Sequence, residues 1–255
     1  MNSTIIFVMM FAALVSSETC GLTEYNSDDH VCYFGYYLCP ILNGEPYQWC
    51  GGARGGCYSK FKYSCKANKL YALEKTGSAF ELTLSNPKIP GIDGLPVHAS
   101  GLKLVSGQDA KTSTYCDPSA PEGLCASAIK NRTIFGISGG IWFLQVQVPG
   151  GQRGYLDNNT WGDGLQYTAA HSASIPEGTE IDDFVAYENG GFFSLLHPYG
   201  WEVCQAKPHS GEGLVYSLRS RPDDGPVPDR CAGVNLLVKD SGLVDADHLW
   251  AWAYI

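Results

Sequence analysis

The chain has 255 residues, a formal net charge of −9 and only 17% charged side chains, whereas glycine (30) and tyrosine (15) are abundant. This acidic balance argues against nucleic acid or a membrane surface as partner, because both bind clustered lysine and arginine. The length allows one or two domains.

Residues 1–17 have the layout of a secretory signal peptide. Residues 5–15 form an apolar run that is too short to span a bilayer, and the small residues Ser16 and Ser17 precede the expected cleavage before Glu18. No lysine or arginine precedes this run, and a buried N-terminal helix or strand is the alternative. We therefore expect a secreted, extracellular protein with no membrane span.

All ten cysteines follow the predicted cleavage site, and an even count in a secreted chain predicts disulfides. They are Cys20, Cys32, Cys39, Cys50, Cys57 and Cys65, crowded together, and the widely spaced Cys116, Cys125, Cys204 and Cys231. The crowded segment buries too little apolar area to fold without bridges, so residues 18–72 are predicted to form a cysteine-rich module whose pairing stays open. Zinc is the competing interpretation, disfavoured because His30 is the segment's only histidine and no C-x-x-C pair occurs.

From about Phe80 the sequence changes to short apolar or alternating runs separated by turn residues. Residues 144–148 (LQVQV) alternate strictly, as a strand with one buried face does. We predict an all-β chain, in which the small disulfide-rich module precedes a larger antiparallel β domain at residues 78–255. A loose threefold plan of strand, glycine turn and aromatic strand slightly favours a β-trefoil-like closed barrel, with a β-sandwich as the alternative.

Two sequons, at Asn131 and Asn158, are candidate N-glycosylation sites.

No catalytic constellation stands out in the sequence. A glycosidase needs two carboxylates converging across a cleft. The candidate acids are Asp182–Asp183, Asp223–Asp224 and Asp245 with Asp247, and the first two pairs look like solvated turn residues. Serine-hydrolase and zinc-protease motifs are absent. We predict no catalytic residue, no metal and no cofactor.

The small module is dense in aromatic residues with polar residues between them. A sugar ring offers an apolar face to an aromatic side chain and a belt of hydroxyls to polar groups. A module with little core cannot bury all these rings, so some are expected at the surface, although an aromatic core is the alternative. The candidate carbohydrate-binding residues are Trp49, Tyr36, Tyr37, Tyr47, Gln48 and Glu45.

The small module resembles carbohydrate-binding module family 52, which accompanies fungal endo-β-1,3-glucanases. The resemblance rests on Cys32, residues 38–40 (LCP), 43–44 (NG), 50–51 (CG), 57–58 (CY) and 63–65 (YSC). The loop at residues 51–56 (GGARGG) is longer than the family's spacing. The resemblance implies binding of β-1,3-glucan.

The rest of the chain resembles the PhiA-like fungal cell-wall proteins. The matching strings are 111–116 (KTSTYC), 149–152 (PGGQ), 170–173 (AHSA), 175–178 (IPEG) and 251–254 (AWAY). The resemblance implies residence in the cell wall and supports the pairings Cys116–Cys125 and Cys204–Cys231 that sequence separation suggests.

Together these patterns predict a secreted, non-catalytic wall protein that binds polysaccharide, most simply β-1,3-glucan. A glycoside hydrolase with an unrecognised catalytic β domain, targeted by the small module, is the alternative. A host-directed role through the same sugar contact also stays open.

Overall fold

The computed structural model describes residues 18–52, 55–76, 79–120, 123–157, 164–196, 200–205, 214–221, 227–243 and 250–255. The predicted signal peptide, the Asn158 sequon and the acids Asp223, Asp224, Asp245 and Asp247 lie outside these ranges. Within them, no helix is long and apolar enough to cross a membrane. Strands dominate the described residues, which contain one short helix, so the all-β prediction is confirmed.

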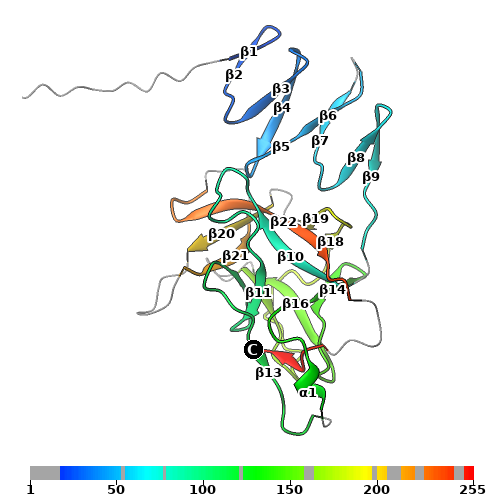
Figure 1. Cartoon of the computed structure of the whole chain (residues 1–255), viewed down its shortest axis with the longest axis vertical. Helices are drawn as coiled ribbons and strands as arrows, with labels where there is room; N and C mark the ends of the chain where they lie inside the picture. Colours follow the sequence, from blue (N-terminus) through cyan, green and yellow to red (C-terminus); the bar gives the residue numbers. More distant parts are fainter. Residues whose placement is uncertain are drawn as a thin grey trace, which may run out of the picture.

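Nine short strands form the small module as four separate antiparallel sheets (Figure 1). The strands are β1 (Glu18–Cys20), β2 (Thr23–Tyr25), β3 (His30–Tyr33), β4 (Tyr37–Leu42), β5 (Glu45–Pro46), β6 (Gln48–Cys50), β7 (Gly56–Tyr58), β8 (Tyr63–Lys66) and β9 (Lys69–Ala72). Sheets this small are not independently stable in water, so other links must hold them together.

Three disulfides supply those links. The bridges are Cys20–Cys32 from β1 to β3, Cys39–Cys57 from β4 to β7, and Cys50–Cys65 from β6 to β8. Each bridge joins one sheet to the next along the chain, so all four sheets are connected. Among the module's described residues, Tyr58 and Phe61 are the fully buried apolar side chains besides three cysteines. Since each bridge typically contributes about 2–4 kcal/mol, the bridges replace most of a core.

The large domain continues the chain with strands and one short helix. Its elements are β10 (Phe80–Ser85), β11 (Val97–Ser100), β12 (Lys103–Ser106), β13 (Thr114–Tyr115), α1 (Leu124–Ser127), β14 (Phe135–Ser138), β15 (Ile141–Leu144), β16 (Gln152–Asp157), β17 (Gly164–Tyr167), β18 (Phe184–Ala186), β19 (Gly191–Ser194), β20 (Trp201–Gln205), β21 (Tyr216–Ser220), β22 (Cys231–Asp240) and β23 (Ala253–Tyr254). Twelve of these strands form one antiparallel sheet, and β13 pairs with β23 apart from it.

The large sheet is not the closed barrel that the sequence slightly favoured. Going around the domain, β10 meets β14 through one residue pair, Phe80 with Phe135, and β12 meets β17 through Lys103 with Gln166. At these two places the strands are joined by single residue pairs and not by extended ladders, whereas β16 pairs more extensively with β15 and β17, and β22 with β19 and β20. This arrangement fits the sandwich alternative.

The strictly alternating run at residues 144–148 is only partly a strand. β15 ends at Leu144, and Val146 forms an isolated parallel bridge with Ala251. The backbone N–H of Val148 donates to the carbonyl of Trp252. The run is extended because it pairs with the C-terminal segment, which its own pattern could not indicate.

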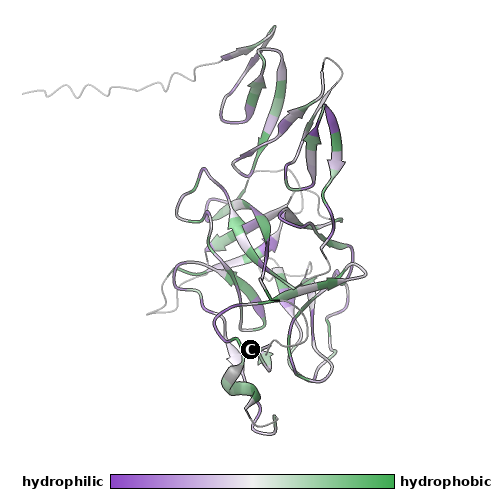
Figure 2. Ribbon diagram, turned by 45° about the vertical axis from the view of Figure 1, so that its right-hand side comes forward, coloured by the Kyte–Doolittle hydropathy of each residue, from purple (hydrophilic) through white to green (hydrophobic). Residues whose placement is uncertain are grey.

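Aromatic rings fill the core of the large domain. Phe192 stacks on Phe184 and Trp201, with ring centroids 5.8 and 5.6 Å apart, and Trp142 meets Phe192 edge-on. Gly154 is required beside this cluster, because a Cβ there would lie 2.0 Å from the Trp142 ring. Figure 2 shows hydrophobic residues on strands of the large domain.

The two disulfides predicted for the large domain are confirmed. Cys204 of β20 and Cys231 of β22 lie opposite each other in the sheet and are bonded. Cys116, just after β13, is bonded to Cys125 of α1.

The small module contacts the large domain through the turn between β4 and β5. Asn43 and Gly44 both have positive φ, 50° and 75°, which an Asn-Gly pair adopts readily in a tight hairpin. The Asn43 amide donates to the carbonyl of Val234 at 3.1 Å. Its side chain lies so close to Gly233 that a Cβ there would be 2.4 Å from the amide oxygen.

An apolar contact supports this turn. Phe61 packs against Val185 and Phe193, and its carbonyl accepts the backbone N–H of Gly191 at 3.0 Å. The ammonium of Lys62 lies 4.1 Å from the centre of the Phe193 ring, and burial lowers the pKa of this lysine. The two modules therefore form one packed molecule, although each has its own disulfides.

We predict that Gly233→Ala will loosen the contact between the modules. The added methyl group would overlap the Asn43 side chain, and overpacking of this kind costs about 1–3 kcal/mol. Limited proteolysis with the disulfides intact should separate the modules faster than in the wild type. Gly91→Ala is the matched control, since no atom lies within 4 Å of its added Cβ. An unchanged cleavage rate in Gly233→Ala would contradict the docking role of Asn43.

Candidate functional site

Two of the predicted aromatic residues lie face to face between hairpins of the small module. Tyr37 begins β4 and Trp49 is central in β6, and their rings stack with centroids 4.0 Å apart and planes 11° apart. The Trp49 indole N–H donates to the carbonyl of Gly51 at 2.8 Å. Both side chains are half-buried. We call Tyr37 and Trp49 the stacked pair.

The register of β3 and β4 explains why these rings meet. Tyr33 lies directly opposite Tyr37 in the hairpin, so both side chains project to the same face. The Tyr33 hydroxyl donates to the carbonyl of Tyr47 at 3.1 Å, beside the start of β6. This face of the β3–β4 hairpin therefore packs on the β6–β7 hairpin, and the stacked pair is part of that packing.

Tyr47 and Gln48 support the same contact. Burial raises the pKa of Tyr47, so its hydroxyl stays protonated well above neutral pH. The Gln48 side-chain oxygen accepts a hydrogen bond of 2.6 Å from the hydroxyl of Tyr58. Both predicted residues are half-buried and lie next to the stacked pair along the chain.

Glu45 does not join this group. Its side chain is buried in the contact with the large domain, where Lys60 lies 2.7 Å away and the Ser85 hydroxyl donates to it at 3.0 Å. A carboxylate engaged on both oxygens in this way holds the modules together and has no access to a sugar beside Trp49. We therefore leave Glu45 out of the candidate site.

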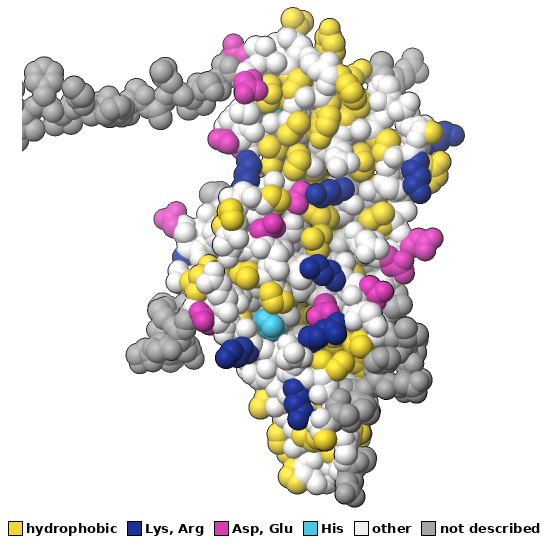
Figure 3. Space-filling model, viewed as in Figure 1, with side chains coloured by type: hydrophobic (Ala, Val, Ile, Leu, Met, Phe, Trp, Pro, Cys, Tyr) yellow, Lys and Arg dark blue, Asp and Glu magenta, His cyan; other side chains and the backbone are white. Residues whose placement is uncertain are grey.

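The most exposed apolar side chains of the module lie at the tips of its first two hairpins. Leu22 is fully exposed in the β1–β2 turn, and Phe34 and Tyr36, in the β3–β4 turn, are 78% and 76% exposed. We call Leu22, Phe34 and Tyr36 the tip surface. Figure 3 shows hydrophobic side chains gathered over the small module, at the top of this view.

The two turns that carry the tip surface are fixed to each other. The backbone N–H of Gly21 donates to the carbonyl of Gly35 at 2.7 Å, and the Cys20–Cys32 bridge lies directly behind. The Tyr36 ring lies over Gly21, where an added Cβ would be 3.7 Å from its Cδ1 atom. The ring is thus supported on one side by a bare backbone turn.

Sequence reasoning included Tyr36 but missed Leu22 and Phe34. The available signal was their position: Phe34 adjoins Gly35 in the short turn between β3 and β4, and Leu22 follows Gly21. Side chains in such turns project into solvent.

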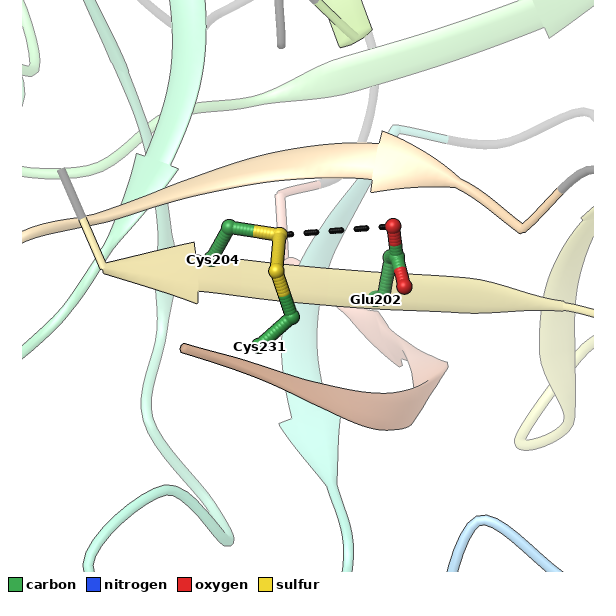
Figure 4. Close-up of side chains that lie close together, drawn as sticks. All are labelled: Glu202, Cys204 and Cys231. Carbon is green, nitrogen blue, oxygen red and sulfur yellow. Dashed lines mark hydrogen bonds between the residues drawn. A yellow bond between two sulfur atoms is a disulfide. The ribbon is translucent and has the colours of Figure 1, made fainter. Parts of the chain in front are cut away.

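A group of metal-type ligands among the described residues proves to be structural. Glu202, Cys204 and Cys231 lie close together, but the two sulfurs are joined in a disulfide (Figure 4). Glu202 is buried and forms an ion pair with Arg219. The carboxylate is neutralised by the guanidinium and the sulfurs are not thiolates, so the group is unsuited to metal binding.

Comparison with known proteins shows what the small module is similar to. Residues 19–70 match a family model described as carbohydrate binding. An uncharacterized secreted protein of Arthroderma benhamiae is 33% identical over 104 residues, which cover 41% of this chain and 48% of that protein. The chain thus spans about half the length of this curated relative. No solved structure matches the chain.

The family match runs from β1 to β9 and includes both the stacked pair and the tip surface. A carbohydrate-binding segment and a secreted relative fit a secreted protein that binds carbohydrate.

We predict that Trp49→Ala lowers stability more than Trp49→Phe. Alanine removes both the ring stack, worth about 0.5–1.5 kcal/mol, and the indole hydrogen bond, worth about 0.5–1.5 kcal/mol, whereas phenylalanine keeps a ring. Thermal unfolding with the disulfides intact measures both. Tyr71→Ser, in a half-exposed side chain of β9, is the control. Unchanged melting of Trp49→Ala would show that the stacked pair does not stabilise the module.

Proposed function

We propose that the protein is a secreted, non-catalytic component of the fungal cell wall that binds wall polysaccharide, β-1,3-glucan above all. The proposed contact residues in the small module are the stacked pair, Tyr37 and Trp49, with Tyr36, Tyr47 and Gln48. The proposal rests on the carbohydrate-binding match of residues 19–70 and on the resemblance of the module's sequence to a glucan-binding family.

The observation that carries the proposal is the fixed geometry of the stacked pair. Trp49 is held by its hydrogen bond to Gly51 and by the bridge at Cys50, and Tyr37 lies two residues before the bridge at Cys39. Both rings retain solvent-exposed area. A ring that is already held in place loses little conformational entropy when a sugar binds, and its apolar contact therefore contributes more to affinity.

The charge balance of the module is consistent with a neutral ligand. Residues 18–72 contain five acids (Glu18, Glu24, Asp28, Asp29 and Glu45) and five bases (Arg54, Lys60, Lys62, Lys66 and Lys69), so the module has no formal net charge. β-1,3-Glucan carries no charge either, so its binding requires no charge complementarity. Asn131 is exposed and available for a glycan, as expected of a secreted glycoprotein.

We predict that the full mature protein is retained by insoluble β-1,3-glucan more strongly than by chitin or cellulose. Tyr37→Ala should weaken retention and the binding of a soluble β-1,3-gluco-oligosaccharide by roughly tenfold, because a ring contact is lost. Tyr37→Phe keeps the ring and is the matched control. Titration calorimetry and pull-down, both well below the melting temperature, measure the effect. Equal binding of wild type and Tyr37→Ala would remove the stacked pair from the site.

We also predict that the pure protein does not hydrolyse laminarin, chitin or cellulose oligomers. Asp182 and Asp183, the described members of the acidic pairs, are exposed neighbours at the start of β18. Hydrolysis would require a second carboxylate across a cleft from one of them. Release of reducing ends is the measurement. Turnover that disappears in Asp182→Asn or Asp183→Asn would establish the hydrolase alternative instead.

A further inference from the structure

The tip surface is a rigid apolar projection that the fold does not cover. Leu22, Phe34 and Tyr36 expose 76% or more of their area, which is possible only for side chains that protrude. Their turns are joined by the Gly21–Gly35 hydrogen bond and by the Cys20–Cys32 disulfide. Exposed apolar groups that are held in one arrangement mark a contact surface more often than a packing fault.

The shape of the tip surface selects a kind of ligand. A single soluble sugar chain is bound best in a groove, where polar groups surround it. Side chains that protrude to this degree can touch a flat or gently curved partner but cannot enclose a chain. The tip surface therefore suits an extended solid face, on which several sugar rings present their apolar sides together.

The charges around the tip surface decide between two extended partners, an anionic lipid bilayer and an uncharged polysaccharide. Glu18 and Glu24, on the β1–β2 hairpin, and Asp28 and Asp29, before β3, are all exposed. The Lys88 ammonium donates a hydrogen bond to the backbone of Asp28, so it lies beside the acids that follow this hairpin. An anionic lipid bilayer would be repelled by the net negative charge, whereas an uncharged polysaccharide would not.

We propose that the tip surface binds the ordered face of insoluble neutral polysaccharide, and that it does so separately from the stacked pair. This inference rests on the proposed function of the small module. It assigns Leu22 and Phe34 to carbohydrate contact. The stacked pair then binds a single sugar chain, and the tip surface binds the face of the insoluble polysaccharide.

The test is a double variant of the full mature protein, Leu22→Ser and Phe34→Asn, which keeps Tyr36 because that residue is also a proposed contact of the sugar chain. Asparagine is chosen because residue 34 has a φ of 54°, which asparagine adopts readily. Retention on insoluble β-1,3-glucan should fall by roughly tenfold or more, while the affinity for a soluble β-1,3-gluco-oligosaccharide and the melting temperature stay unchanged.

The control is a second double variant, Tyr71→Ser and Leu195→Ser, which removes exposed apolar side chains elsewhere and should retain wild-type binding. Equal loss of retention in both variants, or no loss in the tip variant, would overturn the inference. So would wild-type binding to phosphatidylcholine vesicles that the tip variant lacks, because the surface would then belong to a lipid partner. If the wild type binds no polysaccharide, soluble or insoluble, the proposed function fails together with the inference.

Discussion

The small module depends on its three disulfides, which connect four sheets that could not persist alone. Cys20–Cys32, Cys39–Cys57 and Cys50–Cys65 each link a sheet to its successor. They close loops with sequence separations of 12, 18 and 15, so each removes conformational freedom mainly from the unfolded chain. Because this stabilisation requires little burial, the module is free to leave aromatic rings at its surface. In a domain of this size held together by a hydrophobic core, the same rings would be needed inside.

The large domain shows the opposite solution, and the contrast explains how the molecule is divided. Its rings meet in a buried cluster around Trp142, Phe192 and Trp201, and its disulfides lie at the margins of that core. Cys204–Cys231 joins strands that are already paired, so it reinforces the sheet without defining it. Two stabilising strategies thus occur in one chain, and the boundary between them coincides with the change in cysteine spacing near residue 72.

Local features were predictable from the sequence, whereas contacts between distant segments were not. The cysteine counts, the all-β class and the two pairings of the large domain follow from composition and spacing. Glu45 was misplaced because its partner Ser85 is 40 residues away, and nothing near Glu45 reveals that meeting. The closed barrel failed for a similar reason: repeated strand patterns do not show that β10 and β14 touch at one pair only. For Trp49, the sequence allowed either a buried core position or an exposed sugar-binding position, and the half-buried stack on Tyr37 combines features of both.

The contact between the modules fixes which end of the small module faces outward. Asn43 and Glu45, in and beside the β4–β5 turn, and Phe61, just before β8, are all engaged by the large domain. The β1–β2 hairpin lies at the end remote from that contact (Figure 1). Since polar and apolar contacts act together at the boundary, the small module has little freedom to rotate relative to the large domain. A protein attached through its outer hairpins would consequently hold the large domain away from the attached surface. The docking of Asn43 therefore bears on function as well as on stability, because it gives the bound protein a direction.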